Sequence, residues 1–209
     1  MRDVAAIETL RAHLALPQIT LLGHSAGGSV AMQYALTHPD HARALILYST
    51  TATTNKAWAA QLVANLQWFK DEPWFADAVR GLELDETATT QAEIDESWRL
   101  VEPLYFKDWT HDSARLGPFI ARSKIAFDVY KHRETGAPEL LPQLTKLHLP
   151  ALVLTGERDF ICGVVPSTWI AERLPGAKLV VIANAGHVSH IEQPETFGRA
   201  IAELAATLR

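Results

Sequence analysis

Helical and strand-like hydrophobic patterns follow each other in a regular order in the first 50 residues. Over 3–16 the apolar positions recur every three or four residues, which predicts an amphipathic helix. The run 19–22 is short, apolar and bounded by glycine, which predicts a strand buried on both faces. A helix over 29–37 and a second buried strand over 44–48 follow. This order is typical of a right-handed parallel unit.

The same order returns near the C-terminus. Apolar runs predict strands over 151–154 and 178–182, and each strand is followed by a loop and a helix. The first of these helices begins at Pro166 and runs to about residue 173. The last helix begins near Pro194 and carries one apolar stripe, so it should pack against the sheet.

The stretch between these two parts has a different character. Residues 51–140 contain 12 of the 17 aromatic residues, and their apolar positions follow helical spacing throughout. We therefore expect a helical insertion over 51–140 within a core formed by 1–50 and 141–209. The predicted fold class is α/β, with a parallel sheet of about four strands flanked by helices.

Composition and charge exclude several classes of protein. Of 209 residues, 48% are hydrophobic and 21% charged, and the net charge of −5 is not gathered in blocks. A nucleic-acid-binding protein would need a concentrated basic face. No apolar run approaches the roughly 20 residues of a membrane-spanning helix, and Asp3 and Glu8 interrupt any signal peptide. With the single cysteine, Cys162, these features predict a cytoplasmic protein that binds neither nucleic acid nor membrane.

A candidate nucleophile lies between the first predicted strand and the next helix. Gly23, His24, Ser25, Ala26 and Gly27 match the pattern G-x-S-x-G. In such a turn the serine has a strained backbone, and the small residues two positions away on each side let strand and helix approach closely. The N–H of Ala26 is the expected donor to an oxyanion. The alternative is a glycine-rich turn with a structural serine, but the position between strand and helix favours a nucleophile.

A serine nucleophile needs a base and a carboxylate that orients the base. Asp159 follows the strand 151–154, and His187 follows the strand 178–182. Because the carboxyl ends of parallel strands face one edge of a sheet, we expect these two side chains to meet Ser25 there. His187 would accept the Ser25 proton. Asp159 would hold the imidazole tautomer and stabilise its charged form.

Four other side chains compete for these roles. Glu157 could be the carboxylate and Cys162 the nucleophile. His24 could be the base, and His190 could form a metal-binding pair with His187. Glu157 stays open as a substitute, although Asp159 is better placed. His24 is too constrained by the turn, Cys162 has no elbow sequence around it, and no Cys or carboxylate cluster accompanies the histidines. We expect no metal and no cofactor.

Three segments, 22–28, 155–159 and 185–187, resemble the triad segments of the α/β-hydrolase superfamily. The helical insertion lies where that superfamily carries its cap, and the resemblance covers essentially the whole chain. It looks most like the branch related to proline iminopeptidases. The resemblance implies a serine hydrolase that cleaves an ester, amide, lactone or C–C bond next to a carbonyl. A serine at the elbow argues against the dehalogenase and epoxide hydrolase branches, whose nucleophile is aspartate.

The sequence departs from the superfamily pattern before the elbow. Members normally have further strands there, with a His-Gly loop that supplies the second oxyanion N–H, whereas Ser25 lies only 24 residues after Met1. We expect a longer parent protein; a misassigned start codon and a short form completed by a partner are alternatives. In the chain as given, strand 19–22 would form an exposed apolar edge, through which we consider a dimer.

A second departure concerns the substrate. Proline iminopeptidases hold the substrate's amino group with acidic residues, one of which commonly follows the catalytic Asp, and here that position is Phe160. The helical insertion offers Glu93, Asp95, Glu96 and Glu102 instead. Helix-surface carboxylates are usually solvated, and an aromatic-rich cap fits an apolar acyl or aryl substrate. The second function class is a catalytically weak or inactive fragment that serves as a binding module of the same fold.

Overall fold

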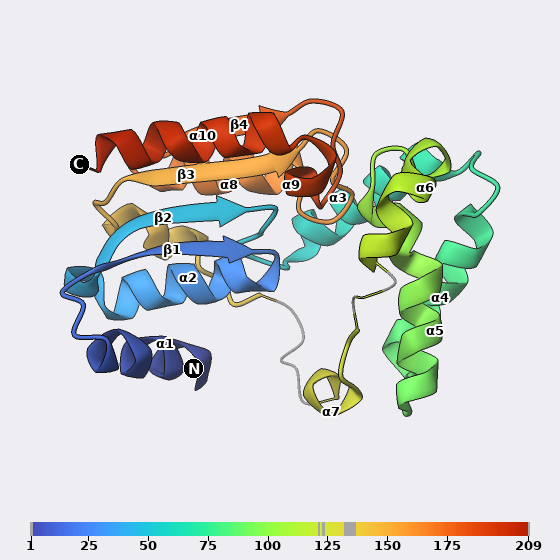
Figure 1. The fold of residues 1–209 in the computed structure, drawn as a ribbon, viewed down its shortest axis with the longest axis horizontal. Coiled ribbons are helices and arrows are strands. Elements are labelled where there is room, and N and C mark those ends of the chain that lie inside the picture. The colour runs from blue at the N-terminus through green and yellow to red at the C-terminus, as the bar shows by residue number, and fades with distance from the viewer. Residues whose placement is uncertain (1, 121, 123, 132–136, 209) are drawn as a thin grey trace.

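The computed structural model describes residues 2–120, 122, 124–131 and 137–208 (Figure 1). Four parallel strands form one sheet in the order β1-β2-β3-β4. They are β1 (Ile19–His24), β2 (Ala42–Tyr48), β3 (Ala151–Gly156) and β4 (Lys178–Ile182). Because the strands are parallel and are added in sequence order, their carboxyl ends all lie at one edge of the sheet.

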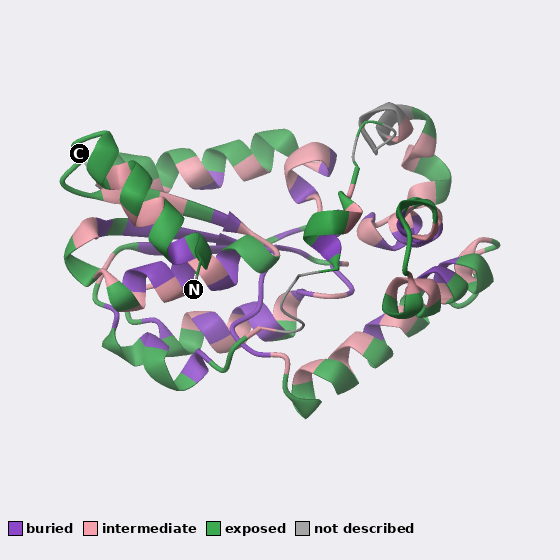
Figure 2. Ribbon diagram, turned by 90° about the horizontal axis from the view of Figure 1, so that it is seen from below, coloured by how far each residue is buried: buried purple, intermediate pink, exposed green. Residues whose placement is uncertain are grey.

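Helices cover both faces of this sheet. They are α1 (Arg2–His13), α2 (Ala26–Thr37), α8 (Val164–Arg173), α9 (Ser189–Glu192) and α10 (Pro194–Thr207), with the 3-10 turns η1 (Pro39–His41) and η4 (Leu141–Lys146). Successive side chains of a strand point to opposite faces. Leu45 and Leu47 of β2 therefore pack in the cluster with α2 and α8, whereas Ile46 and Tyr48 pack in the cluster with α10. Buried residues accordingly follow the strands in Figure 2.

Between β2 and β3, the part of the chain from α3 to α7 is mostly helical and lies beyond the carboxyl ends of the strands (Figure 1). It contains α3 (Lys56–Leu66), α4 (Phe75–Thr87), α5 (Gln91–Val101), α6 (Trp109–Ile120) and α7 (Phe127–Tyr130), with the 3-10 turns η2 (Gln67–Phe69) and η3 (Glu102–Tyr105). Thr90 begins α5 with a capping box to Glu93. The expected helical patterning is confirmed for the described part; residues 121, 123 and 132–136 of this range lie outside it.

An apolar cluster joins the helical segment to the sheet. Its buried members are Phe69, Ala78, Val101, Leu104 and Phe160. The first four come from the helical segment, and Phe160 comes from the loop that follows β3. Inside the segment, α4 and α5 pack closely at Gly81, where an added Cβ would lie 2.7 Å from the Leu100 Cβ. The helices are thus anchored beside the residue that follows Asp159.

Three sequence expectations about the first 50 residues need correction. The strand β1 is not buried on both faces: it lies at an edge of the described sheet, and Leu22 is 51% exposed. The helix α1 ends at His13 rather than at residue 16. The helix α2 begins at Ala26, three residues earlier than expected, because the chain enters it directly from the turn at Ser25. The expected exposed edge at β1 is confirmed.

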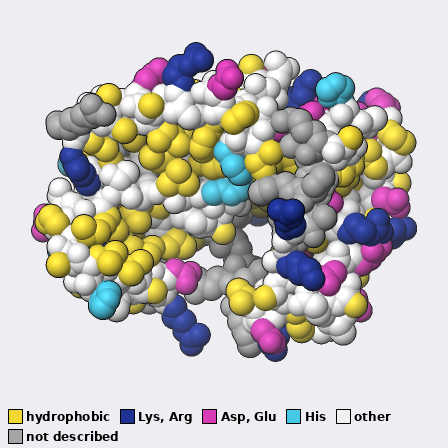
Figure 3. All heavy atoms as spheres, in the orientation of Figure 1, with side chains coloured by type: hydrophobic (Ala, Val, Ile, Leu, Met, Phe, Trp, Pro, Cys, Tyr) yellow, Lys and Arg dark blue, Asp and Glu magenta, His cyan; other side chains and the backbone are white. Residues whose placement is uncertain are grey.

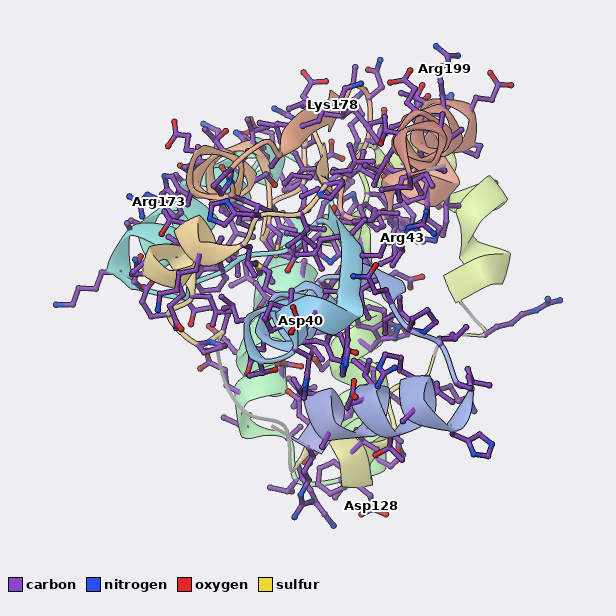
Figure 4. All side chains as sticks on the ribbon, turned by 90° about the vertical axis from the view of Figure 1, so that its left-hand side faces the viewer. Asp40, Arg43, Asp128, Arg173, Lys178 and Arg199 are labelled. Atoms are coloured by element: carbon purple, nitrogen blue, oxygen red, sulfur yellow. The ribbon has the colours of Figure 1, made fainter. Side chains whose placement is uncertain are left out.

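Charged side chains surround the opposite, amino-terminal edge of the sheet. Figure 4 shows Asp40, Arg43, Arg173 and Lys178 on this side of the molecule. Lys178 Nζ lies 2.6 Å from a Glu203 carboxylate oxygen.

None of the described helices has both the length and the apolar character needed to cross a lipid bilayer.

The close approach of β1 and α2 at Gly23 gives a test of the fold. A Cβ at this position would lie 2.5 Å from Gly27 O and 2.6 Å from Gly28 Cα. Because these are backbone atoms that cannot rotate away, we expect Gly23→Ala to lower the free energy of unfolding by about 1–3 kcal/mol. Urea unfolding measures this change.

The variant Gly27→Ala is the matched control. No described atom outside its own helix lies within 4 Å of a Cβ added at Gly27. Alanine also has the higher helix propensity, so this variant should keep its stability or gain about 0.5–1 kcal/mol. Equal losses in the two variants would contradict the packing that we describe.

Candidate active site

Ser25 occupies a strained turn between β1 and α2. Its φ of 53° and ψ of −125° are unusual for a residue with a side chain, and such a conformation costs about 1–3 kcal/mol unless the surroundings hold it. The end of β2 supplies that support. The Ser25 N–H donates to Tyr48 O at 3.0 Å, and the Thr50 hydroxyl donates to Ser25 O at 2.6 Å. The turn is therefore clamped by the neighbouring strand.

The glycines around Ser25 have different roles. Gly23 is required by the close approach of strand and helix, as expected from the pattern. For Gly27 that expectation is wrong, because no described atom outside its own helix lies within 4 Å of a Cβ added there. The close contact lies one residue later, where a Cβ on Gly28 would overlap the Thr50 side chain. Ala26 is the first residue of α2, so its N–H has no acceptor within the helix and faces outward at the helix N-terminus.

Asp159 and His187 form a buried pair beside this turn. The relative exposure of Asp159 is 0% and that of His187 is 2%. His187 Nδ1 lies 3.0 Å from each oxygen of the Asp159 carboxylate. Asp159 Oδ1 also accepts the N–H of Ile161 at 3.1 Å and of Cys162 at 3.0 Å. With Nδ1–H facing the carboxylate, the neutral ring carries its lone pair on Nε2, the form that accepts a proton.

Asp159 is ionised at neutral pH in spite of its burial. Burial alone raises the pKa of a carboxyl group. The charge and hydrogen bond of His187, together with the Cys162 N–H, outweigh this effect and lower the pKa of Asp159 below its usual value. Asp159 is therefore a carboxylate that can hold the imidazole and stabilise its protonated form.

The backbone of His187 is held from two sides. Its carbonyl oxygen lies 3.1 Å from His24 Nε2 and accepts the Tyr48 hydroxyl at 3.0 Å, both from the sheet. Its N–H donates to Tyr105 O at 2.8 Å, in the helical segment. The Tyr105 ring lies edge-on to the His187 ring, with centroids 5.2 Å apart. Sequence reasoning missed Tyr48 and Tyr105, because neither belongs to a motif.

Three histidines gather at the carboxyl edge of the sheet, where Figure 3 shows a group of histidine side chains. The His24 ring stacks on Tyr48 with centroids 4.4 Å apart and lies 4.8 Å from the His187 ring. Burial, and then unfavourable electrostatic interactions with His187 and His190, lower the pKa of His24 to about 4. Burial also lowers the pKa of His190, whose Nδ1 lies 3.1 Å from the Tyr48 hydroxyl. His24 is therefore neutral at pH 7 and supports the loop of His187.

Ser25 and His187 lie at the same edge of the sheet but are not joined directly. In the described part of the chain, no hydrogen bond links the Ser25 hydroxyl to the His187 ring. Catalytic hydrogen bonds are commonly long in the absence of substrate and shorten in the complex. The geometry thus contains the pairing of His187 with Asp159, and the contact of His187 with Ser25 stays a prediction.

The competing residues are placed elsewhere or are inert. Glu157 is exposed, and its carboxylate accepts the Asn184 N–H at 3.1 Å, so Asp159 rather than Glu157 contacts His187. Cys162 is buried, and burial followed by the nearby Asp159 charge raises the pKa of its thiol well above the usual value. Its thiol therefore stays protonated and is a poor nucleophile.

One group of potential metal ligands lies away from this edge. In the described residues, ligand atoms of Glu8, His38 and His41 come within 4.8 Å of one another, on α1, after α2 and in η1. The Glu8 carboxylate is 2.7 Å from Arg11 and accepts the Tyr34 hydroxyl at 2.8 Å. Because the Arg11 guanidinium already neutralises Glu8, this arrangement is a charge network of the protein itself.

The acidic residues of the helical segment are mostly engaged within their own helices. Glu93 caps α5, Asp95 accepts the Gln91 amide at 2.8 Å, and Glu96 pairs with Arg99 at 2.6 Å. Phe160 is 1% exposed and packed in the apolar cluster, so it offers no polar contact.

Glu102 differs from these residues. It borders a cavity of about 260 Å³ with Trp74, Arg99 and Trp109. Burial, opposed in part by Arg99, raises the pKa of Glu102 to about 7. This carboxyl group is therefore only partly ionised at neutral pH, which weakens it as a partner for a substrate ammonium group.

Comparisons with known proteins agree with this architecture. Residues 2–194 match the family described as the alpha/beta hydrolase fold. A 3-oxoadipate enol-lactonase from Acinetobacter baylyi is 26% identical over 189 residues, which are 90% of this chain and 64% of that protein. A proline iminopeptidase from Lactobacillus acidophilus is 26% identical over 214 residues, covering 93% of this chain and 68% of that protein.

A solved structure shows the same fold at lower sequence identity. An alpha/beta fold family hydrolase from Bacillus anthracis superposes with a TM-score of 0.72 at 19% identity and covers 96% of this chain and 72% of its own. The chain spans less than two thirds of the length of the enol-lactonase that it resembles.

The half-buried His24, next to Ser25, gives a prediction for the pH dependence of stability. The pKa of His24 is about 4 in the folded chain, against about 6.5 in an unfolded chain. Between these values the unfolded state binds more protons, so stability falls as the pH drops from about 6.5 to about 4. The variant His24→Gln keeps an N–H donor for His187 O but does not titrate. Urea unfolding at pH 7 and pH 5 should show that the wild type loses about 1–2 kcal/mol more than this variant.

The control is His148→Gln, at an exposed position in the loop before β3. This variant should lose as much stability between the two pH values as the wild type does. If His24→Gln showed the wild-type loss as well, His24 would not be the half-buried, neutral histidine that we describe.

Proposed function

Because the chain belongs to the α/β hydrolase fold family, we propose that it is a serine hydrolase with Ser25 as nucleophile, His187 as base and Asp159 as orienting carboxylate. The observation that carries this proposal is the buried pair in which His187 Nδ1 lies 3.0 Å from both Asp159 oxygens. We further propose that 51–140 forms a cap over a core made of 1–50 and 141–209. The helices beyond the carboxyl ends of the strands support this division.

The first half of the reaction forms an acyl-enzyme. Ser25 Oγ attacks the substrate carbonyl carbon while His187 Nε2 takes the hydroxyl proton. Asp159 stabilises the imidazolium that results, because the carboxylate already accepts the Nδ1–H. The carbonyl oxygen becomes an oxyanion near the free N–H of Ala26 at the start of α2. The intermediate collapses when His187 gives its proton to the leaving group, which leaves the acyl group on Ser25.

The second half releases the acid. A water molecule attacks the acyl carbon, and His187 Nε2 takes one of its protons. The second tetrahedral intermediate collapses when His187 returns that proton to Ser25 Oγ, so the free serine and the carboxylic acid are formed. Each proton that leaves Ser25 or water therefore passes through the same ring nitrogen.

The surroundings favour a neutral ester or lactone as substrate. Glu93, Asp95 and Glu96 have partners within their own helix, and Phe160 replaces the acid that would follow the catalytic aspartate. The Tyr105 ring of the helical segment packs edge-on against His187 instead, and the Phe160 ring packs against Tyr105. Among the relatives, the enol-lactonase is named for a lactone substrate. An apolar wall suits an uncharged acyl group better than an ammonium group.

A fluorophosphonate probe tests the mechanism directly. We expect the wild-type chain to be phosphonylated at Ser25 with loss of fluoride, and mass spectrometry of the digested protein locates the label. Ser25→Ala should take up none. His187→Ala should react about 10²–10⁴ times more slowly, because the general base is missing.

The control for the base is His148→Ala, an exposed histidine that should leave the labelling rate unchanged. Label that persists in Ser25→Ala would mean that another residue is the nucleophile. A folded wild-type chain that takes up no probe would instead support the non-catalytic binding module.

Paired substrates test the acyl specificity. We expect kcat/KM for a p-nitrophenyl butyrate ester to exceed that for proline p-nitroanilide by at least about tenfold. The reason is that an aromatic ring lies against His187, whereas Glu93, Asp95 and Glu96 are already paired and Glu102 is only partly ionised. Glu102→Gln should leave the ester turnover unchanged. A preference for the proline substrate that is lost on N-acetylation and in Glu102→Gln would identify an aminopeptidase.

A further inference from the structure

The loop of His187 is tied to the helical segment by a buried glutamate that belongs to neither the elbow nor the Asp–His pair. We propose that Glu192 is a positioning residue, whose carboxylate fixes His187 relative to the segment 105–107. Its effect on turnover rests on the serine hydrolase function proposed above. Its effect on the loop does not.

The Glu192 carboxylate bridges two segments that are far apart in the sequence. Glu192 ends α9 and is 6% exposed. One oxygen accepts the Gly186 N–H at 2.7 Å, and the other accepts the Lys107 N–H at 2.9 Å. Hydrogen bonds from N–H groups to an ionised carboxylate are stronger than those between neutral groups, and a buried site strengthens them further.

The two bridged segments also touch through their backbones. A Cβ on Gly186 would lie 2.6 Å from Tyr105 O and 3.0 Å from Lys107 N. The next residue, His187, donates its N–H to the same Tyr105 O at 2.8 Å. Only glycine allows this approach at position 186. Glu192 therefore bridges two backbone segments, 105–107 and 186–187, that touch with no side chain between them.

Apolar side chains shield this contact. Phe106 is 1% exposed and packs with Trp109, Val188 and Ile191. Its two neighbours in the chain, Tyr105 and Lys107, supply the backbone groups that bond to the His187 loop. Phe106 thus fills the space beside the polar bridge and restricts the access of water to it.

Together these contacts make His187 a link between the two parts of the chain. The sheet holds its carbonyl oxygen through His24 and Tyr48, and the helical segment holds its N–H through Tyr105. Glu192 strengthens the link to the helical segment, because it bonds to the N–H of Gly186, one residue before His187, and to the N–H of Lys107. Loss of the bridge should let the imidazole shift relative to Ser25, and a shift of about 1 Å can lower a rate by 10²-fold.

A glutamine at position 192 tests this inference. Glu192→Gln keeps one acceptor oxygen, but its NH₂ group faces the second backbone N–H, so one bridge bond is lost. We expect the amide hydrogens of Gly186 and Lys107 to exchange at least about tenfold faster than in the wild type. We also expect kcat for the butyrate ester, per fluorophosphonate-titrated site, to fall about 10- to 100-fold with KM changed less than about twofold.

The matched control is Glu195→Gln, an exposed glutamate in the first turn of α10. It should leave both the exchange rates and kcat at wild-type values. Should Glu192→Gln fail to fold, Glu192→Asp is measured in the same way; its shorter carboxylate reaches less far, so exchange should still rise and kcat fall.

Each result decides a separate question. Wild-type exchange rates and wild-type kcat per titrated site in the folded Glu192 variant would overturn the inference, as would a loss confined to KM. A wild-type chain that takes up no probe would overturn the proposed hydrolase function instead. In that case faster exchange at Gly186 and Lys107 alone still supports the bridge, and unchanged exchange still rejects it.

Discussion

The site depends on a parallel backbone ladder that continues past the ends of the strands. In register, His24 lies beside Tyr48, Tyr48 beside Leu154, and Gly156 beside Ile182. The residue after each of the first three strands still donates its N–H to the neighbouring strand: Ser25 to Tyr48 O, Ser49 to Leu154 O, and Glu157 to Ile182 O. The turns that carry the polar side chains therefore begin at the same level. This common edge is the reason why residues from distant parts of the sequence lie close together.

The second constraint comes from the helical segment. Its residues 105–107 lie against the loop that carries His187, and Phe160 anchors the same segment beside Asp159. His187 is thus bonded to both the sheet and the helical segment, and Asp159 precedes the residue that packs on that segment. A shift of the helices relative to the sheet edge should therefore move the His187 imidazole, because the backbone of His187 is bonded to both parts. The strained Ser25, in contrast, is held at the end of β2, where Tyr48 O accepts its N–H and the Thr50 hydroxyl donates to its carbonyl oxygen. The Gly28 N–H of α2 donates to the same carbonyl oxygen at 3.0 Å.

Much of the fold could be predicted from local patterns. The strand 178–182 is found where the apolar run places it, and the strand β3 begins at the predicted residue. The sequence patterns gave wrong predictions where the burial of a residue depends on its neighbours in the tertiary structure. The run 19–22 looks like an interior strand, but at the sheet edge Leu22 is half exposed. The G-x-S-x-G pattern also suggested that both of its glycines serve the close approach of strand and helix. In the described residues, however, a Cβ added at Gly27 meets no atom outside its own helix within 4 Å, and Gly28 is the position crowded by Thr50.

The sequence by itself determined the order of the elements and the chemical types that follow each strand, because hydrophobic period and turn residues are local properties of the chain. From these it predicted Ser25, Asp159 and His187 at one edge, and their catalytic roles stay predictions. Only the tertiary structure decided that Asp159 rather than Glu157 contacts His187, that burial keeps His24 neutral, and that Glu192 joins Gly186 to Lys107. These outcomes depend on burial and on distances between segments about 80 or more residues apart in some cases, which no local pattern encodes.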